Sequence, residues 1–296
     1  MASSRGVAPR WEKVLWKRQP YPDNYVDKSF MSQLQMNGNV YLPRFGTIAL
    51  VSVGIPQQFA CVLFFVALFE HLRTGTLSSG TLIAGSTGTT LCIALISSYA
   101  RENGALLRSI PGIAVLVLTL NALSPILRTL TEATTSDSIW ALATVLFGGH
   151  LALADYSMTR SLQSPLQSTV SLNLAMCASV VLASRLRRDT DVFALLLLAL
   201  QLFAIYPLLR DRIYVGYGNI CAGAIIPAAA VPLTLVHVAC AMYAMAPISR
   251  LVAYVVLPGV SVFICVMCPL FMRRAQRWKR ELRGPWDEAV LQPNVC

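Results

Sequence analysis

Apolar residues along the chain gather into eight long stretches separated by short polar segments. Each stretch has roughly 18 to 28 residues, enough for a helix rising about 1.5 Å per residue to cross a hydrocarbon core about 30 Å thick. The pattern predicts an all-α polytopic membrane protein with about eight transmembrane helices. The predicted stretches are 46–70, 81–100, 110–127, 138–157, 167–186, 191–209, 219–245 and 251–272.

The distribution of basic residues predicts the orientation of this bundle. An even number of spans places both termini on one side, and the termini and the loops sharing their side hold 18 of the 24 Lys and Arg residues. Because the cytosolic side carries the Lys/Arg excess, both termini are expected in the cytosol. The expected parts are a cytosolic N-terminal amphipathic or interfacial segment (1–45), a transmembrane helical bundle (46–272) and a cytosolic C-terminal tail (273–296).

Composition supports a membrane protein. Hydrophobic residues make up 55% of the chain and charged residues 13%, and the mean hydropathy is +0.59. The net charge of +10 lies mostly where anionic lipid headgroups are expected, so we expect a membrane partner and no nucleic acid. Seven of the eight cysteines lie inside predicted spans and are interpreted as small apolar packing residues.

The segments outside the predicted spans are short. The ends are about 45 and 24 residues long, whereas a nucleotide-binding α/β half-domain needs several βαβ units of about 30 residues each. We therefore expect no catalytic residue, cofactor or metal site in this chain, and a sugar-nucleotide donor site, if one is involved, on another polypeptide.

Aromatic residues alternate with basic ones near both ends. They favour either an interfacial anchor or a docking surface for a partner subunit, and the sequence leaves both open. The candidate docking residues are Trp11, Trp16, Tyr21, Tyr25 and Trp286.

The stretch HLALADY, residues 150–156, places His150, Asp155 and Tyr156 in an otherwise apolar span. His150 and Asp155 match H-x-x-x-x-D, the pattern of glycerolipid acyltransferases, so a stand-alone acyltransferase-like enzyme using them is the alternative function. Five residues on a helix subtend about 500°, so the two side chains point apart. Polar groups in spans normally hydrogen-bond across helices or line a cavity.

Two charged segments are predicted on the lumenal side. Arg128, Glu132 and Asp137 are expected to hold a tight structural hairpin through charge-assisted contacts, with Ser136 or Asp137 capping the next helix. The D-x-D sequence at 189–191 resembles the metal-diphosphate clamp of many glycosyltransferases. Its position at the start of a span favours a helix cap instead.

Four blocks of the sequence resemble PIG-C, a family of subunits of the phosphatidylinositol N-acetylglucosaminyltransferase complex. They are WEKVLWKRQPYPDNYVDKSF, LSPILRTLTEATTSDSIWALATVLFGGHLALADY, SLNLAMCASVVLASRL and GPWDEA, and the resemblance covers nearly the whole chain.

The resemblance implies a role in the first step of glycosylphosphatidylinositol (GPI) anchor biosynthesis. The complex transfers N-acetylglucosamine from UDP-GlcNAc to phosphatidylinositol at the cytosolic face of the endoplasmic reticulum. It implies a multi-pass, non-catalytic scaffold in that membrane whose partners are the catalytic subunit PIG-A, the subunits PIG-H, PIG-P, PIG-Q and PIG-Y, and phosphatidylinositol. His150, Asp155 and Tyr156 would form a polar patch that grips a neighbouring span or seats the inositol headgroup, with Arg108 and Arg160 attracting the lipid phosphate.

Overall fold

A computed structural model describes residues 12, 14, 16–22, 25–26, 35–36, 44–99, 105–129, 134–154, 156, 165–210, 230–279 and 282–283. The chain divides into two compact units. The larger unit is Pro43–Met272, and the smaller one combines Met1–Leu42 with Arg273–Cys296.

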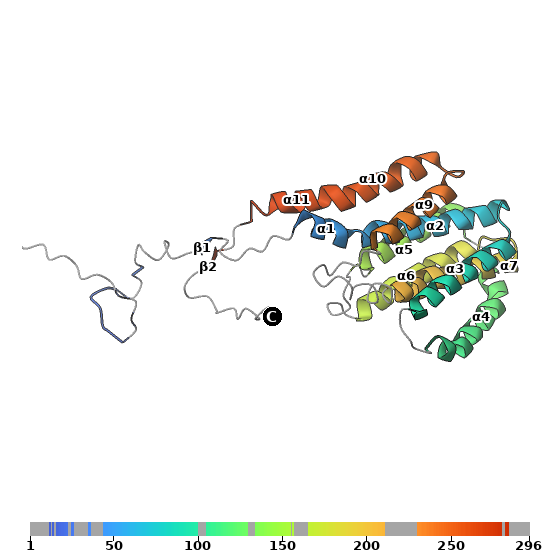
Figure 1. Ribbon diagram of the computed structural model, residues 1–296, viewed down its shortest axis with the longest axis horizontal. Helices are drawn as coiled ribbons and strands as arrows, with labels where there is room; N and C mark the ends of the chain where they lie inside the picture. The colour runs from blue at the N-terminus through green and yellow to red at the C-terminus, as the bar shows by residue number, and fades with distance from the viewer. Residues whose placement is uncertain are drawn as a thin grey trace, which may run out of the picture. The chain divides into compact units, whose positions relative to one another are not determined.

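The larger unit is built from helices, which confirms the all-α prediction (Figure 1). Helices occur within every predicted apolar stretch. The α-helices are α1 (Phe45–Ser52), α2 (Gly54–Thr74), α3 (Ser79–Tyr99), α4 (Ala105–Thr129), α5 (Ser136–Leu153), α6 (Pro165–Ala183), α7 (Asp189–Ala199), α9 (Ala230–Met245), α10 (Leu257–Val262) and α11 (Cys268–Ala275). The π-helices are η3 (Leu200–Ile205), η4 (Val252–Val256) and η5 (Phe263–Met267).

Three continuous helical segments among the described residues are long and apolar enough to cross a membrane. They are Phe45–Thr74, Asp189–Arg210 and Val252–Ala275, of 30, 22 and 24 residues. Shorter apolar helices accompany them: Ser79–Leu95, Val115–Thr129, Thr169–Ala183 and Ala230–Met245. Length and composition therefore support a membrane-embedded helical protein.

Prolines account for the wide turns in two of these segments. Each of η3, η4 and η5 ends two residues before a proline: Pro207, Pro258 and Pro269 respectively. A proline inside a helix lacks the backbone N–H, and its ring clashes with the carbonyl four residues earlier. A π-turn just before the proline gives that carbonyl more room, so the helix continues with a local bulge.

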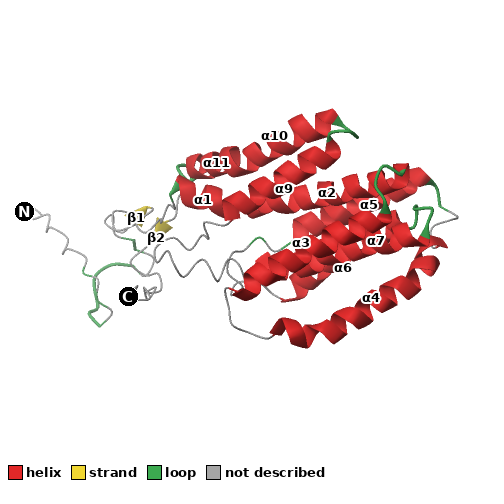
Figure 2. Cartoon of the chain, turned by 45° about the vertical axis from the view of Figure 1, so that its right-hand side comes forward, coloured by secondary structure: helices red, strands yellow, loops and turns green. Residues whose placement is uncertain are grey.

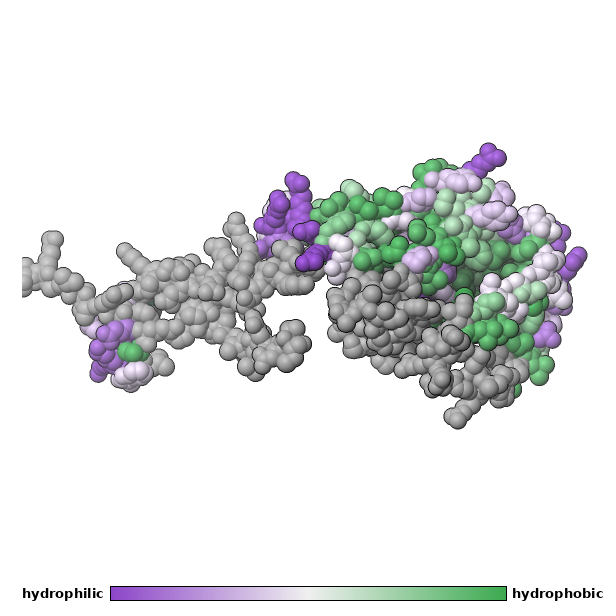
Figure 3. Space-filling model, viewed as in Figure 1, coloured by the Kyte–Doolittle hydropathy of each residue, from purple (hydrophilic) through white to green (hydrophobic). Residues whose placement is uncertain are grey.

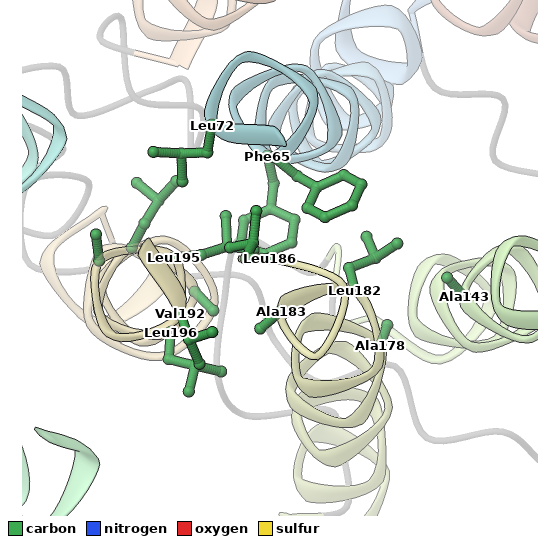
Figure 4. Close-up of a cluster of buried hydrophobic side chains, with 14 of the residues drawn as sticks. Phe65, Leu72, Ala143, Ala178, Leu182, Ala183, Leu186, Val192, Leu195 and Leu196 are labelled. Carbon is green, nitrogen blue, oxygen red and sulfur yellow. The ribbon is translucent and has the colours of Figure 1, made fainter. Parts of the chain in front are cut away.

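The core of the larger unit lies where α2, α5, α6 and α7 meet. Phe65 of α2, Phe147 of α5 and Phe203 of η3 are buried, with ring centroids 5.5 to 5.9 Å apart. Figure 4 shows Phe65 near Leu195 of α7 and Leu186, with Leu182 and Ala183 of α6 alongside. Burial of an apolar side chain of this size stabilises a fold by about 1.5–3 kcal/mol in water; inside a bilayer, close packing contributes instead.

Helices α5 and α6 lie side by side, as do α2 and α9 (Figures 1 and 2). Gly149 permits the first contact, because a Cβ atom built there would lie 3.1 Å from Cδ1 of Leu174. The adjacent Gly148 has no such neighbour within 4 Å. Small residues at such positions let membrane helices approach closely.

Large apolar side chains cover much of the outer surface of the larger unit (Figure 3). Helix α4 exposes Val115 and Leu118, and the last helical segment exposes Tyr254, Phe263 and Phe271. Strongly hydrophilic side chains gather near the helix ends. An exterior with many exposed large apolar side chains matches a protein whose solvent is lipid.

In the smaller unit, the N-terminal and C-terminal segments pair with each other. Strand β1 (Gln35–Met36) is antiparallel to β2 (Leu282–Arg283), with Gln35 opposite Arg283 and Met36 opposite Leu282. This two-residue ladder is a minor departure from the all-α prediction.

Candidate functional site

The imidazole of His150 is held between three helices. Gln58 of α2 donates a hydrogen bond from Nε2 to His150 Nε2 at 2.7 Å. His150 Nδ1 lies 2.9 Å from both the carbonyl and the hydroxyl oxygen of Ser171 in α6, and the Ser171 hydroxyl donates to the His150 carbonyl at 3.0 Å. Because a carbonyl only accepts, Nδ1 carries the proton and Nε2 is the acceptor.

This arrangement leaves His150 little capacity for acid–base chemistry. Its side chain is buried, and Phe203 packs edge-on against the ring at 5.2 Å between centroids. A general base needs a lone pair within reach of the substrate proton, and the Nε2 lone pair is occupied by Gln58. The geometry therefore favours an interhelical role over the acyltransferase alternative.

Of the other residues in the predicted polar patch, the structure describes Tyr156 fully. Its hydroxyl donates to the carbonyl of Leu151 at 2.5 Å, and its ring lies beside Gly54 at the start of α2. Asp155 and Arg160 lie outside the described residues. Arg108 lies in α4, but its side chain is outside the described part. His150 and Tyr156 therefore contact α2 at different residues, Gln58 and Gly54 respectively.

A second polar cluster, whose members sequence analysis did not bring together, lies beside the first. We define the Arg210 cluster as Gln57, Cys61, Tyr206, Arg210 and His237. Gln57 of α2 donates from Nε2 to the Tyr206 hydroxyl at 2.5 Å, and the Tyr206 ring lies 4.7 Å from that of His237 in α9. The adjacent Gln57 and Gln58 therefore serve different helices.

Arg210 is the charged member of this cluster. Its side chain is 8% exposed at the end of the segment Asp189–Arg210. It lies close enough to Cys61 and His237 for electrostatic interaction. In the sequence, Arg210 counted only as one of the basic residues at the cytosolic end of a span. The signal available there was its spacing of four residues from Tyr206, which places both on one helix face.

Arg128, one of the charged residues predicted to hold a lumenal hairpin, has its partners at the start of α7. Arg128 Nε lies 3.2 Å from Asp189 Oδ1, and Arg128 also donates to the carbonyl of Arg187 at 3.2 Å. Arg128 thus joins the end of α4 to the start of α7, while Glu132 lies outside the described residues. The side chains of Arg128 and Asp189 are 41% and 45% exposed, so this ion pair contributes at most about 1 kcal/mol.

Both helix caps lie earlier in the chain than expected. Thr135, not Ser136 or Asp137, is the N-cap of α5, and its hydroxyl accepts from the amide of Ser138 at 3.4 Å. For α7 the N-cap is Arg188, whose side chain forms no cap hydrogen bond. Asp137, Asp189 and Asp191 instead lie in the first turns, where a carboxylate interacts favourably with the helix dipole.

The aromatic residues proposed for partner docking are only partly described. Trp16 is 87% exposed, and Tyr21 stacks on Tyr25 with ring centroids 4.2 Å apart. Trp11 and Trp286 lie outside the described residues. Residues 16–22 form bends and irregular backbone without a helix.

Within the described part of the chain, no three His, Cys, Asp or Glu residues come together in a way that could hold a metal ion. Six described cysteines are free thiols. The buried polar contacts that the described residues show are hydrogen bonds between helices, and Arg210 is a buried cation near a helix end.

Taken together, the apolar helices and the buried polar contacts between them define an all-helical membrane protein. A family model described as phosphatidylinositol N-acetylglucosaminyltransferase, GPI2, matches residues 11–287. The chain belongs to this family, that of the GPI2 or PIG-C subunits.

Three curated relatives illustrate the similarity. The chain is 33% identical to the GPI2 subunit of phosphatidylinositol N-acetylglucosaminyltransferase from Schizosaccharomyces pombe, over 95% of this chain and 86% of the relative. It is 32% identical to the C subunit of that enzyme from Homo sapiens, over 97% and 94%. It is 34% identical to a putative C subunit from Dictyostelium discoideum, over 95% and 80%. No solved structure matches the chain significantly.

Proposed function

We propose that this chain is a non-catalytic membrane subunit of the complex that transfers N-acetylglucosamine from UDP-GlcNAc to phosphatidylinositol, the first step of GPI-anchor biosynthesis. The observation that carries the proposal is membership of the GPI2 family across residues 11–287. The near-complete coverage of the human relative supports the transfer of its role to this chain. In this role the chain is a scaffold for the catalytic subunit and positions the acceptor lipid.

The proposed topology has about eight spans in residues 46–272, with both termini in the cytosol and the bundle in the endoplasmic reticulum membrane. The pairing of β1 with β2 supports termini on one side. Contacts at the helix ends that are proposed to be lumenal support helices that alternate in direction across the membrane. His71 Nε2 donates to the carbonyl of Ala244 at 2.9 Å, so the C-terminal ends of α2 and α9 meet.

Side-chain contacts also join other helix ends that are predicted to be lumenal. Arg128 links the end of α4 to Asp189 at the start of α7, and Arg185 donates to Thr134 just before α5. An up-and-down bundle with an even number of spans brings these loops to the same face. The 18 to 6 division of basic residues then assigns that face to the lumen.

Within this proposal, His150 acts as an interhelical tie rather than as a headgroup ligand. Both of its ring nitrogens face protein partners. Partner subunits would dock away from His150; in this family they are PIG-A, PIG-H, PIG-P, PIG-Q and PIG-Y. The candidate contact in the N-terminal segment is the exposed Trp16 together with the Tyr21–Tyr25 stack.

Co-purification tests the assembly role. An affinity-tagged full-length chain should isolate the catalytic subunit from detergent-solubilised membranes, and Trp16→Ala should lower the yield of that subunit several-fold. Trp278→Ala removes another exposed tryptophan, which is 72% exposed, and serves as the matched control. Recovery of the wild-type chain without any glycosyltransferase subunit would contradict the proposal.

A further inference from the structure

The Arg210 cluster combines a buried cation with a side-chain acceptor that has no hydrogen-bond partner among the described residues. Arg210 is 8% exposed in a membrane-embedded unit, where a guanidinium is costly unless an anion or strong hydrogen-bond acceptors compensate it. Its five N–H donors allow it to serve a protein neighbour and an external anion at once. A buried arginine in a span is accordingly a candidate ligand site.

Gln57 supplies the unused acceptor. Its side chain is 0% exposed, and its amide nitrogen is committed to the Tyr206 hydroxyl. Its carbonyl oxygen Oε1 is buried without a hydrogen-bond partner among the described residues. A buried amide carbonyl left unpaired costs about 1–3 kcal/mol, so a ligand that supplies a hydroxyl donor here is favoured.

His237 adds a second acceptor. Its Nδ1 donates to the carbonyl of Leu233 at 2.7 Å, so in the neutral ring Nε2 is the unprotonated nitrogen. The ring lies against Tyr206 and is half-buried. The cluster thus offers one guanidinium and two hydroxyl acceptors on three helices.

The cluster also lies toward the end of the bundle that is proposed to be cytosolic, where the headgroup of the acceptor lipid would enter. Arg210 ends the segment that begins with Asp189, and Asp189 belongs to the face proposed as lumenal. Tyr206 and Gln57 lie about one helical turn deeper, or about 6 Å at 1.5 Å per residue. A ligand entering from the cytosolic headgroup layer would meet Arg210 first.

We propose that the Arg210 cluster binds the headgroup of phosphatidylinositol. The phosphodiester pairs with the Arg210 guanidinium, and ring hydroxyls of inositol donate to Gln57 Oε1 and His237 Nε2. The charge pairing uses N–H donors of Arg210 beyond those that serve its protein contacts, and an inositol hydroxyl satisfies the buried Gln57 Oε1. The inference rests on the proposed function and names the place where the acceptor lipid is held.

Lipid retention tests the proposal. The full-length chain is reconstituted in nanodiscs of phosphatidylcholine containing equal minor fractions of phosphatidylinositol and phosphatidylserine, then extracted into detergent. Native mass spectrometry counts the retained lipids. The wild-type chain should retain phosphatidylinositol in preference to phosphatidylserine, and Arg210→Gln should lower that retention about tenfold, the loss expected for one charged hydrogen-bonded contact. Arg273→Gln, at an exposed basic residue outside the cluster, should change it little.

A second pair of variants decides the result if Arg210→Gln does not fold. Gln57→Leu and Gln58→Leu each remove one buried interhelical amide, but only Gln57 belongs to the cluster. Gln57→Leu should lower phosphatidylinositol retention several-fold, and Gln58→Leu should not. Equal retention by the two variants would overturn the proposal.

Two further outcomes would also overturn it. Equal retention of phosphatidylserine would show recognition of charge alone, and displacement of the lipid by inorganic phosphate would show a site for the free anion. Either result leaves the role in the complex intact, because that role is judged by co-purification. Conversely, loss of co-purification together with selective lipid retention would contradict the role in the complex and support the lipid site.

Discussion

The side chains of Gln58 and His150 meet through their Nε2 atoms, 2.7 Å apart and buried between α2 and α5. The same imidazole contacts Ser171 of α6 through Nδ1. One histidine therefore joins the consecutive helices α5 and α6 to α2, which is far from both in the sequence. In lipid, where apolar side chains gain little by leaving the solvent, such polar contacts contribute to specificity.

We predict that Gln58 and His150 are energetically coupled. Gln58→Leu and His150→Leu should each lower the free energy of unfolding by about 1–3 kcal/mol, because each leaves a buried polar group unpaired. The double variant should lose less than the sum, with a coupling of about 0.5–2 kcal/mol. Reversible unfolding in mixed micelles measures all four proteins. Strict additivity would show that the contact contributes nothing.

The glycine pair in α5 provides a matched test of helix packing. Gly149→Val places a branched side chain against Leu174 of α6, whereas Gly148→Val enters open space. The intrinsic cost of valine in a helix is similar at both positions, so the difference reports the clash. We predict that Gly149→Val is less stable than Gly148→Val by about 1–3 kcal/mol in thermal unfolding.

Equal stability of the two variants would mean that α5 and α6 do not approach closely at Gly149. Gly149→Ala then serves as a graded check. The thermal stability of Gly149→Ala should lie between that of the wild type and that of Gly149→Val, because the terminal methyl group of Leu174 can shift by a few tenths of an ångström.

Membrane topology can be tested with glycosylation acceptors. An N-x-T acceptor on a flexible linker inserted between α2 and α3, at residues 75–78, should be glycosylated in endoplasmic reticulum membranes. The same insert after Lys279 should remain unmodified, because both termini are proposed to be cytosolic. The inverse pattern of modification would reverse the proposed orientation, and modification of both sites would rule out an even number of spans.

Much of the helical framework follows from apolar length alone. The predicted stretch 81–100 corresponds to α3 (Ser79–Tyr99), and 110–127 lies within α4 (Ala105–Thr129). The boundaries extend beyond the apolar runs because terminal turns are polar. The π-bulges before Pro207, Pro258 and Pro269 were not predicted, and Pro111 and Pro125 lie inside the continuous α-helix α4.

The polar contacts were beyond prediction from one sequence. Gln57 and Gln58 are neighbours with the same chemistry, yet one bonds Tyr206 and the other His150. Which partner each meets depends on how three helices pack, and helical periodicity carries no such information. For the same reason Arg128 was assigned to its own hairpin, although its acidic neighbour is Asp189, 61 residues further along the chain.

Reconstituted transfer tests the central claim most directly. Vesicles containing phosphatidylinositol and UDP-GlcNAc would receive the isolated full-length chain, the complete complex, or the complex prepared without this chain. We predict that N-acetylglucosaminyl phosphatidylinositol forms with the complete complex, that the isolated chain forms none, and that omitting the chain lowers the rate at least tenfold, a barrier change of about 1.4 kcal/mol or more. Product formed by the isolated chain would contradict the account.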